Sequence, residues 1–320
     1  MNLLPPLKFT PIIKPVPWGG RKLEKLFNKV LPDGVPCGES WEVVDLPGDQ
    51  SVVTTGPLAS HDLAMIISDR QQDLLGEAEL LMGRFPLLFK LLDAKQTLSV
   101  QVHPDAESCK RLACGARPKT EAWYILQAEA GARLYLGLEP GVGPKDLRRA
   151  LEEGTVADLL QEVEVHAGDF VYLPSGTLHA IGAGIVLAEI QQSSDTTYRV
   201  FDWNRVGLDG KPRQLHAEEA LESIHYEVSG KPAHAPPLSG RPGIRCEQFT
   251  FERIGMGPGA DVPLDAGRPR IICCIEGSGS ISQTGQEPLP LLVGETCLVP
   301  ACRAESLMSE QGGTFLLIRA

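Results

Sequence analysis

Residues 168–179 bring a single histidine to the end of a tight turn. The segment has the form G-x5-P-x-G-x2-H and ends at His179. Its first half, Phe170 to Leu173, is a short run of β-forming residues, and Pro174 would end the pairing of such a strand. The following Ser-Gly pair supplies a turn, and the returning strand then presents the histidine. A histidine placed in this way is suited to line the inside of a β-barrel and to bind a metal there.

A second histidine lies in a strictly alternating segment, residues 98–103. Gln101 and His103 are two residues apart, so on a strand both side chains leave the same face. Leucine and valines occupy the other face, where they can pack against covering elements. The polar face would be costly inside a small barrel unless it were satisfied, so it indicates a site. Glu121 opens the next predicted strand and adds a carboxylate.

Two imidazoles, a carboxylate and an amide oxygen form a mixed nitrogen and oxygen ligand set. This set suits Zn²⁺, and Fe, Mn or Co are also compatible with it. No cysteine takes part, which argues against a closed structural zinc site, and such a set leaves positions open for water or substrate. The predicted ligands are Gln101, His103, Glu121 and His179.

Two cations accompany the predicted ligands. Lys119 precedes Glu121 by two residues and would point the same way if the strand has begun there. Arg199 lies in a polar run between two apolar β segments. An acidic protein that gathers cations beside a metal site is suited to an anionic substrate such as a phosphate, which arginine contacts in a bidentate manner and lysine as a point charge.

Most of the chain reads as short strands and turns with a few helices. Ser60 is expected to cap a helix that runs to Arg70. The other expected elements are strands over Phe85–Leu92 and Glu121–Leu126, extended segments before residue 56, and helical stretches over Asp105–Leu112, 144–160 and 217–224.

A spacing that occurs twice in the sequence predicts two related domains. The spacing from Gly168 to Pro174 recurs from Gly294 to Pro300, and in this second copy Glu305 takes the position of His179. We therefore expect two cupin-like β-barrels of jelly-roll type with a few short helices, the second without a metal site. The expected boundaries are 1–232 for the catalytic domain, with short helical insertions, and 233–320 for a degenerate domain, joined by a linker rich in proline and glycine near 229–242.

Composition excludes several classes of protein. The formal net charge of −11 argues against a nucleic-acid partner. No apolar run approaches the length of a membrane span, and the first residues do not form a signal peptide. The eight cysteines form no C-x2-C pair and are expected to be free thiols in a reducing cytoplasm. Nothing in the sequence specifies an oligomeric state.

Taken together, the motifs resemble those of class I mannose-6-phosphate isomerases in their short bacterial form, which belong to the cupin superfamily. The resemblance covers most of the chain from Phe9 to Tyr226 and weakens after Gly240. The resemblance rests on six segments: L-S-V-Q-V-H-P at 98–104, K-T-E at 119–121, the turn at 174–179, S-D-T-T-Y-R at 194–199, W-G-G at 18–20 and G-E-S-W-E at 38–42.

The resemblance implies one Zn²⁺ per chain, bound by the four residues named above, with Arg199 as the catalytic arginine. It implies that Lys119, Asp195 and Trp18 line the substrate pocket. The implied reaction interconverts D-mannose 6-phosphate and D-fructose 6-phosphate through a cis-enediol. A zinc-bound hydroxide, Lys119 and His61 are alternatives for the base. Two other functions remain open: another cupin enzyme, such as a sugar-phosphate epimerase or an iron-dependent dioxygenase, and a non-catalytic sugar-phosphate binder.

Overall fold

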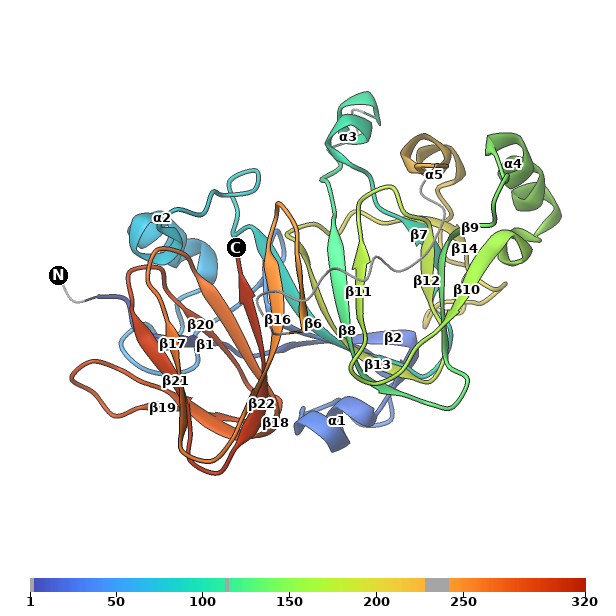
Figure 1. The fold of residues 1–320 in the computed structure, drawn as a ribbon. Helices are drawn as coiled ribbons and strands as arrows, with labels where there is room; N and C mark the ends of the chain where they lie inside the picture. The colour runs from blue at the N-terminus through green and yellow to red at the C-terminus, as the bar shows by residue number, and fades with distance from the viewer. Residues whose placement is uncertain (1–2, 113–114, 228–241) are drawn as a thin grey trace.

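The computed structural model describes residues 3–112, 115–227 and 242–320. Within these ranges the protein is mainly β with a few short helices, as predicted. Two groups of sheets lie side by side, one built from the N-terminal part of the chain and one from its C-terminal part (Figure 1). The predicted linker and the predicted boundary between residues 232 and 233 lie outside the described residues.

The N-terminal unit is a sandwich of two antiparallel sheets. One sheet has six strands, in the order β11 (Phe170–Leu173), β8 (Glu121–Ala128), β13 (Ile185–Gln192), β6 (Leu87–Ala94), β2 (Ile12–Gly20) and β3 (Cys37–Val43). The other has five, in the order β10 (Leu160–Glu164), β9 (Arg133–Leu138), β12 (His179–Ile181), β7 (Val100–Val102) and β14 (Tyr198–Phe201). A two-stranded ribbon, β4 (Asp45–Leu46) and β5 (Asp49–Gln50), follows β3.

The strand that carries the predicted ligands is shorter than its alternation indicates. Val100 and Val102 pack on the outer side of their sheet, in a cluster with residues of the covering helices such as Leu147 and Ala220. Leu98 instead joins the core between the two sheets, together with Trp123. Its backbone N–H donates to Ile181 O, but the regular strand begins only at residue 100, so the alternation does not extend back to Leu98.

The C-terminal unit forms one sheet system of nine strands. Its main path is β1 (Leu7–Lys8), β20 (Thr296–Val299), β18 (Arg270–Ile281), β22 (Gly313–Arg319), β16 (Thr250–Met256) and β15 (Gly243–Arg245). The remaining strands are β17 (Ala260–Leu264), β19 (Leu289–Leu292) and β21 (Glu305–Ser309). The order β20-β18-β22-β16 repeats the order β11-β8-β13-β6 of the first unit, and β19-β18-β21-β17 repeats β10-β9-β12-β7. The repeated spacing in the sequence therefore has a counterpart in strand order.

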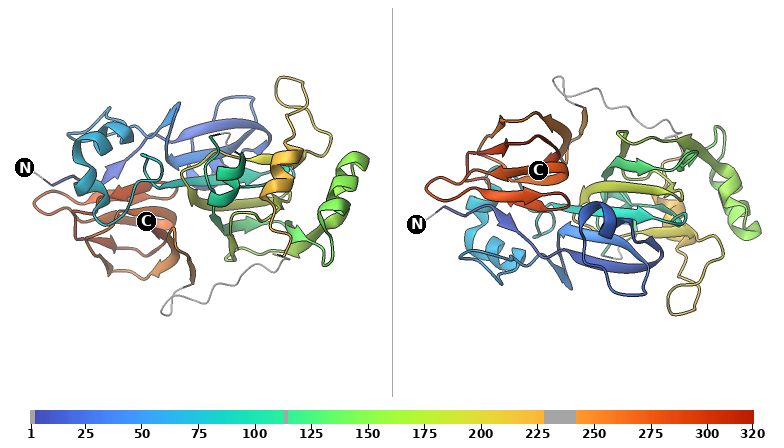
Figure 2. Two further views of the ribbon diagram at one scale, coloured as in Figure 1. Left: turned by 90° about the horizontal axis from the view of Figure 1, so that it is seen from above. Right: turned by 90° about the horizontal axis from the view of Figure 1, so that it is seen from below.

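Five α-helices lie at the margins of the sheets in the described residues: α1 (Lys22–Phe27), α2 (Leu63–Leu75), α3 (Ala106–Leu112), α4 (Pro144–Glu153) and α5 (Ala217–Ser223). Helices α3, α5 and α4 follow one another along one edge of the N-terminal unit, with α4 farthest from the C-terminal unit (Figures 1 and 2). Helix α4 ends at Gly154, whose φ of +73° suits glycine, so the helical stretch expected up to residue 160 is divided, and a 3₁₀ turn follows at Val156–Leu159.

The expected cap of α2 is wrong. The cap is Asp62, whose Oδ1 accepts the backbone N–H of Met65 at 2.7 Å. Ser60 instead has a φ of +70°, outside the extended region that an N-cap adopts. The helix is kinked at Arg70, where the expected helix ends, because φ of −139° and ψ of 35° are not helical there. A further helical segment runs to Leu75 and docks on the C-terminal unit, where Leu74 O accepts the N–H of Ala301.

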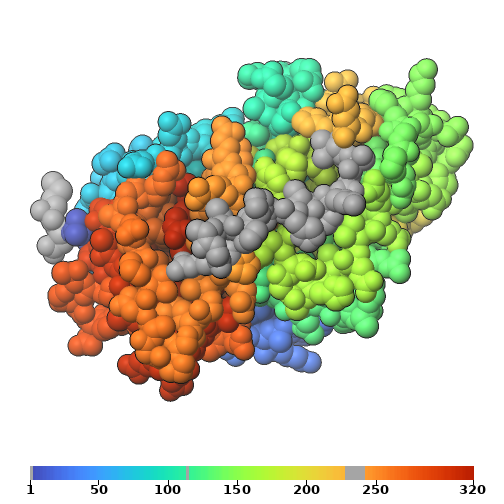
Figure 3. Space-filling model, in the orientation of Figure 1, coloured from blue at the N-terminus to red at the C-terminus, as the bar shows by residue number. Residues whose placement is uncertain are grey.

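The two units meet through buried polar contacts as well as apolar packing. Lys29 and Glu42 form an ion pair of 2.6 Å, and Lys29 Nζ also donates to Gly294 O of the second unit. Thr296 Oγ1 donates to Glu42 Oε2 at 3.2 Å. In the space-filling view the units form one continuous body (Figure 3). No helix among the described residues is long and apolar enough to cross a membrane.

Candidate metal centre

Strand register sets three of the predicted site residues in one row. Gln101 on β7 pairs with His179 on β12 and with Arg199 on β14. Residues directly opposite each other in neighbouring strands present their side chains on the same face of the sheet. The side chains agree with this, because Gln101 Nε2 lies 3.3 Å from His179 Nε2. The row faces the six-stranded sheet, across the interior of the sandwich.

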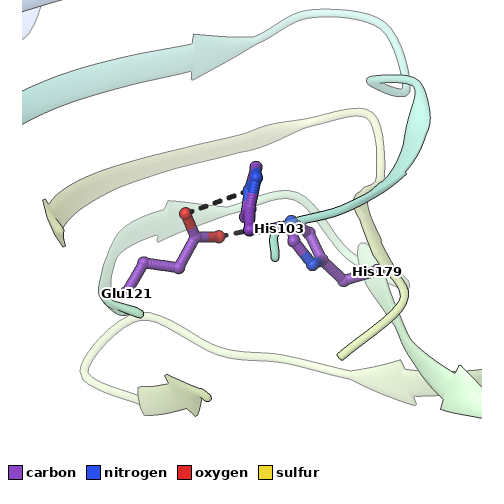
Figure 4. Close-up of side chains that lie close together, drawn as sticks. All are labelled: His103, Glu121 and His179. Carbon is purple, nitrogen blue, oxygen red and sulfur yellow. Dashed lines mark ion pairs between the residues drawn. The ribbon is translucent and has the colours of Figure 1, made fainter. Parts of the chain in front are cut away.

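Glu121 reaches this row from the opposite sheet. It begins β8, and its carboxylate lies between the two histidines, with Oε1 at 3.2 Å from His179 Nε2 and Oε2 at 3.4 Å from His103 Nε2 (Figure 4). Lys119 points the same way, as predicted: its Nζ lies 2.8 Å from Glu121 Oε2 and 3.0 Å from His103 Nε2. Residues far apart in sequence thus converge on one point.

The backbone fixes the orientation of both imidazoles. His103 Nδ1 donates to Thr196 O, and His179 Nδ1 donates to Thr177 O, each at 2.9 Å. These bonds turn both Nε2 atoms toward Glu121. A ligating histidine commonly has its second ring nitrogen held in this way, which fixes the tautomer and the ring plane.

The spacing of the ligand atoms fits a metal ion. His103, Glu121 and His179 are buried and offer ligand atoms within 4.8 Å of one another. A tetrahedral ion with ligands about 2.0–2.1 Å away separates them by about 3.3 Å, close to the distances seen here. Both carboxylate oxygens of Glu121 are buried without a hydrogen-bond partner, and only Oε2 has the Lys119 ammonium as a counter-charge. The unpartnered Oε1 is a costly acceptor unless a cation satisfies it.

The electrostatics hold the three side chains in the forms that bind a metal. Burial first, and the charge of Lys119 next, lower the pKa of His103 to about 4. Burial also lowers the pKa of His179. Burial alone would raise the pKa of Glu121, but the charge of Lys119 holds it well below the usual value. At neutral pH the site therefore presents neutral imidazoles and an ionised carboxylate.

Arg199 is half-buried beside the metal cluster. Its Nε donates to Ser99 Oγ at 3.4 Å, and its Nη1 donates to Gln214 O at 2.9 Å. Burial first, and then the charge of Arg213, lower its pKa. Ser99 lies on the same face as Gln101, as the alternation predicts, and its hydroxyl is 3.4 Å from Gln101 Oε1.

The two remaining predicted pocket residues lie in different settings. Asp195 is exposed, in the loop between β13 and β14. Its neighbour Thr196 supplies the carbonyl that orients His103. Trp18 is buried in the core between the sheets, where the β-carbon that an alanine would place at Gly38 would lie 2.3 Å from its ring.

His61 is not placed to act as the base. It lies in the loop that precedes α2, where its Nδ1 is 3.4 Å from Ala59 O. This helix lies beside the C-terminal unit, away from β7 and β12 (Figure 1). His61 was therefore wrongly included among the alternatives.

A buried row of charges that the sequence reasoning missed continues from the site. Glu189 on β13 pairs in register with Trp123 on β8 and with Lys90 on β6. Its Oε2 accepts Trp123 Nε1–H at 3.0 Å, and its Oε1 lies 3.1 Å from Lys90 Nζ. The Trp123 ring meets the His179 ring edge-on, with centroids 5.5 Å apart. Lys90 also lies 3.7 Å from Glu39 Oε2. The sequence does contain a sign of this row, because Lys90 and Glu189 are charged residues within mostly apolar strands.

Comparison with known proteins agrees with this geometry. Residues 7–126 match the family model of the type I phosphomannose isomerase catalytic domain. A probable mannose-6-phosphate isomerase of Bacillus subtilis is 41% identical over 234 residues, which are 73% of this chain and 72% of that protein. A second mannose-6-phosphate isomerase of the same organism is 36% identical over 92% of this chain and 93% of its own length.

The fold matches as well. The crystal structure of the mannose 6-phosphate isomerase from Bacillus subtilis superposes with a TM-score of 0.88 and 30% identity, and covers 99% of this chain and 100% of that one. A mannosephosphate isomerase structure from Archaeoglobus fulgidus, at 22% identity and a TM-score of 0.78, shows the same fold. On the identity and coverage of these relatives, together with the buried cluster of His103, Glu121 and His179, the chain belongs to the mannose-6-phosphate isomerase family of type I.

Proposed function

We propose that this protein is a metal-dependent aldose–ketose isomerase that interconverts D-mannose 6-phosphate and D-fructose 6-phosphate. The observation that carries the proposal is the buried cluster in which His103 and His179 turn their Nε2 atoms toward the carboxylate of Glu121. The relatives that match most of this chain are named for that reaction.

We assign the metal ligands to Gln101, His103, Glu121 and His179, and the metal to one Zn²⁺ per chain. The mixed nitrogen and oxygen donor set supports zinc, and the absence of cysteine from it favours a catalytic role. A zinc ion at this position supplies a Lewis acid for the oxygen atoms on the two reacting carbons. Gln101 would join through its amide oxygen, which requires the amide to rotate, since its nitrogen now faces His179.

Isomerisation moves a proton between the first and second carbons through a cis-enediol. Arg199 is placed to stabilise the negative charge that develops on the oxygens of this intermediate, because its guanidinium stays charged and lies in register beside Gln101. Arg199 uses Nε to bond Ser99 Oγ and Nη1 to bond Gln214 O. A guanidinium has five N–H groups, so others are left to donate to a substrate.

Lys119 is our candidate for handling the proton, since a base must lie within hydrogen-bond reach of the reacting carbons. His103 Nε2 has one lone pair, which can accept from Lys119 or bind a metal but cannot do both. When that lone pair is engaged by a metal, Lys119 keeps Glu121 as its partner and has an N–H group free to donate a proton to a substrate oxygen; to take a proton from carbon it must first lose one and act as the neutral amine. A metal-bound hydroxide remains the alternative base. We assign Asp195 and Trp18 to the substrate pocket on the resemblance alone.

The decisive experiment is a coupled assay on mannose 6-phosphate, with detection of fructose 6-phosphate. We expect turnover by the purified protein, its loss after thorough chelation, and its return with added Zn²⁺. Activity that survives chelation would remove the metal mechanism. Binding of mannose 6-phosphate without conversion would make the protein a non-catalytic binder.

We further infer a catalytic domain over residues 1–232, a degenerate domain over 233–320, and a cytoplasmic location. Cys273, Cys274 and Cys297 are buried free thiols, which supports a reducing compartment. The net charge of −11 argues against a nucleic-acid partner, and it does not exclude a small anionic substrate, for which a few local cations suffice.

A further inference from the structure

Two arginines bind one carboxylate at the end of β14. Asp202 follows this strand and is buried. Arg213 grips it with two bonds, Nε to Oδ2 at 2.7 Å and Nη2 to Oδ1 at 2.5 Å. Arg205 Nη2 donates to Oδ1 at 2.8 Å. Arg199 lies close enough for its pKa to be affected by the charges of Arg213, Asp202 and Arg205.

The cluster carries more positive charge than its own contacts neutralise. Two guanidinium groups pair with a single carboxylate, which leaves a local surplus of one positive charge in a chain whose formal net charge is −11. Asp202 is the carboxylate within salt-bridge distance of Arg205 and Arg213 among the described ion pairs. A surplus of this kind, held in place and partly buried, is costly unless an anion shares the site.

One donor in the cluster lacks a partner. Arg205 Nε is buried and makes no hydrogen bond. Arg213 uses Nε and Nη2 for the carboxylate, which leaves its Nη1. The side chains of Arg205 and Arg213 are 17% and 21% exposed, so solvent reaches them. Asp202 thus orients the guanidinium groups of Arg205 and Arg213. Each guanidinium keeps N–H groups that can donate to a further acceptor.

The cluster lies near the start of β7, whereas the metal ligand His103 follows the end of that strand. Going back along the chain from His103, the residues are Gln101 at the metal cluster, Ser99 against Arg199, and then Leu98. The loop after β14 is tied to this last position, because Trp203 Nε1 donates to Leu98 O at 2.6 Å. Three residues of extended chain span about 10 Å, comparable with the reach of an open sugar chain from its second carbon to a phosphate on its sixth.

We propose that Arg205 and Arg213, oriented by Asp202, bind the phosphate group of the sugar phosphate, with Arg199 between them and the reacting carbons. The inference rests on the proposed isomerase function for the identity of the sugar, and on the cluster itself for the phosphate. The loop that carries both arginines, between β14 and α5, projects from the body of the protein (Figure 2). In this arrangement the loop binds the phosphate end of the substrate at the rim of the site, while the metal cluster contacts the reacting carbons.

Arg205→Gln is the sharpest test, because Asp202 keeps Arg213 as its partner and no buried carboxylate is left unpaired. We expect the KM for mannose 6-phosphate to rise at least tenfold while kcat changes less than threefold. We also expect inorganic phosphate, used as the probe in calorimetry and as a competitive inhibitor, to bind at least tenfold more weakly. Arg148→Gln is the matched control, since it breaks an exposed two-bond contact with Glu218; both values should be unchanged.

Asp202→Asn combined with Arg213→Gln tests the second arginine without leaving a buried carboxylate unpaired, while Arg205 keeps its charge. It should weaken phosphate binding as Arg205→Gln does, with metal content unchanged. Wild-type affinity for inorganic phosphate in both the Arg205→Gln and the double variants would overturn the proposal, and so would a fall in unfolding temperature alone. If the wild-type protein failed to convert mannose 6-phosphate, the calorimetric measurement would still decide whether the cluster binds phosphate, so the two failures are distinguishable.

Discussion

Acidification of the metal-free protein should reduce its stability through His103. The ordinary pKa of histidine is 6.5, and that of His103 in the folded chain is about 4, because burial and then Lys119 disfavour its charged form. As the pH falls through 6.5 the unfolded chain takes up a proton that the folded chain refuses. The stability that His103 contributes is therefore present above pH 6.5 and is lost progressively toward pH 4.

The size of the effect follows from these two values. Between pH 7.5 and pH 5 the differential protonation of a group with those pKa values lowers the free energy of unfolding by about 2 kcal/mol. His179 contributes in the same direction, because burial lowers its pKa too. Glu121 does not oppose them over this range, since its folded pKa lies well below the usual value and it stays ionised.

The assay is urea unfolding in the presence of chelator at pH 7.5, 6 and 5, followed by tryptophan fluorescence. Trp123 is a suitable reporter because its ring contacts the His179 ring. We expect His103→Gln to show a decrease in stability with acidification that is smaller than the wild-type decrease by about 2 kcal/mol. The surface variant His166→Gln is the control and should follow the wild type. Parallel curves for His103→Gln and the wild type would refute the buried, neutral state that we assign to His103.

The remaining predictions concern the metal, the chemistry and the turn. Glu121→Gln should lower metal affinity at least tenfold, measured by competition with a chelator, because the charged ligand is lost from the buried cluster; retained affinity would show that the carboxylate is not a ligand. Arg199→Ala should lower kcat by about 100-fold with metal content retained, whereas loss of metal would make Arg199 structural. Gly176→Ala should destabilise the protein by about 1–3 kcal/mol in thermal unfolding, because its φ is +85° and the new β-carbon would lie 2.6 Å from the His225 ring; an unchanged unfolding temperature would contradict the strain.

The parts of the site that depend on local periodicity could be predicted from the sequence. A strand has a period of two, so Gln101 and His103 had to share a face, and so did Lys119 and Glu121 once the strand was placed. The turn before His179 is likewise local, because a strand, a proline and a glycine suffice to define it.

The parts that depend on register between distant strands could not be predicted in the same way. All eight residues of β6 are buried, so Lys90 and Asp93 are two charged residues in an otherwise apolar strand. The partner of Lys90, Glu189, is 99 positions away and becomes its neighbour only through the pairing of β13 with β6. The cap of α2 failed for a related reason: Ser60 and Asp62 are both good caps, and the bonds that tie residues 60–63 to the chain near Val53 select Asp62.

The second unit shows why the same frame holds only one metal cluster among the described residues. Strand register aligns its positions with those of the first unit: β18 begins at Arg270, opposite Val299, as β8 begins at Glu121, opposite Leu173. By the same comparison Glu305 takes the place of His179, and Leu264 takes the place of Gln101. One ligand has become a cation, one a carboxylate and one an apolar side chain.

At the position of Glu121 the second unit has Arg270, which cannot bind a metal and adds a positive charge. Its guanidinium is buried and donates to four backbone carbonyls, those of Asp265, Arg268, Pro300 and Arg303. A metal ion near that position would face a fixed positive charge and would find no imidazole to bind it. The arginine ties the segment before β18 to the turn after β20, which meet at one end of this strand pair, so it stabilises the second unit without a metal. Restoring a histidine at Glu305 alone would therefore not restore metal binding, since the cation that replaced Glu121 would still oppose it.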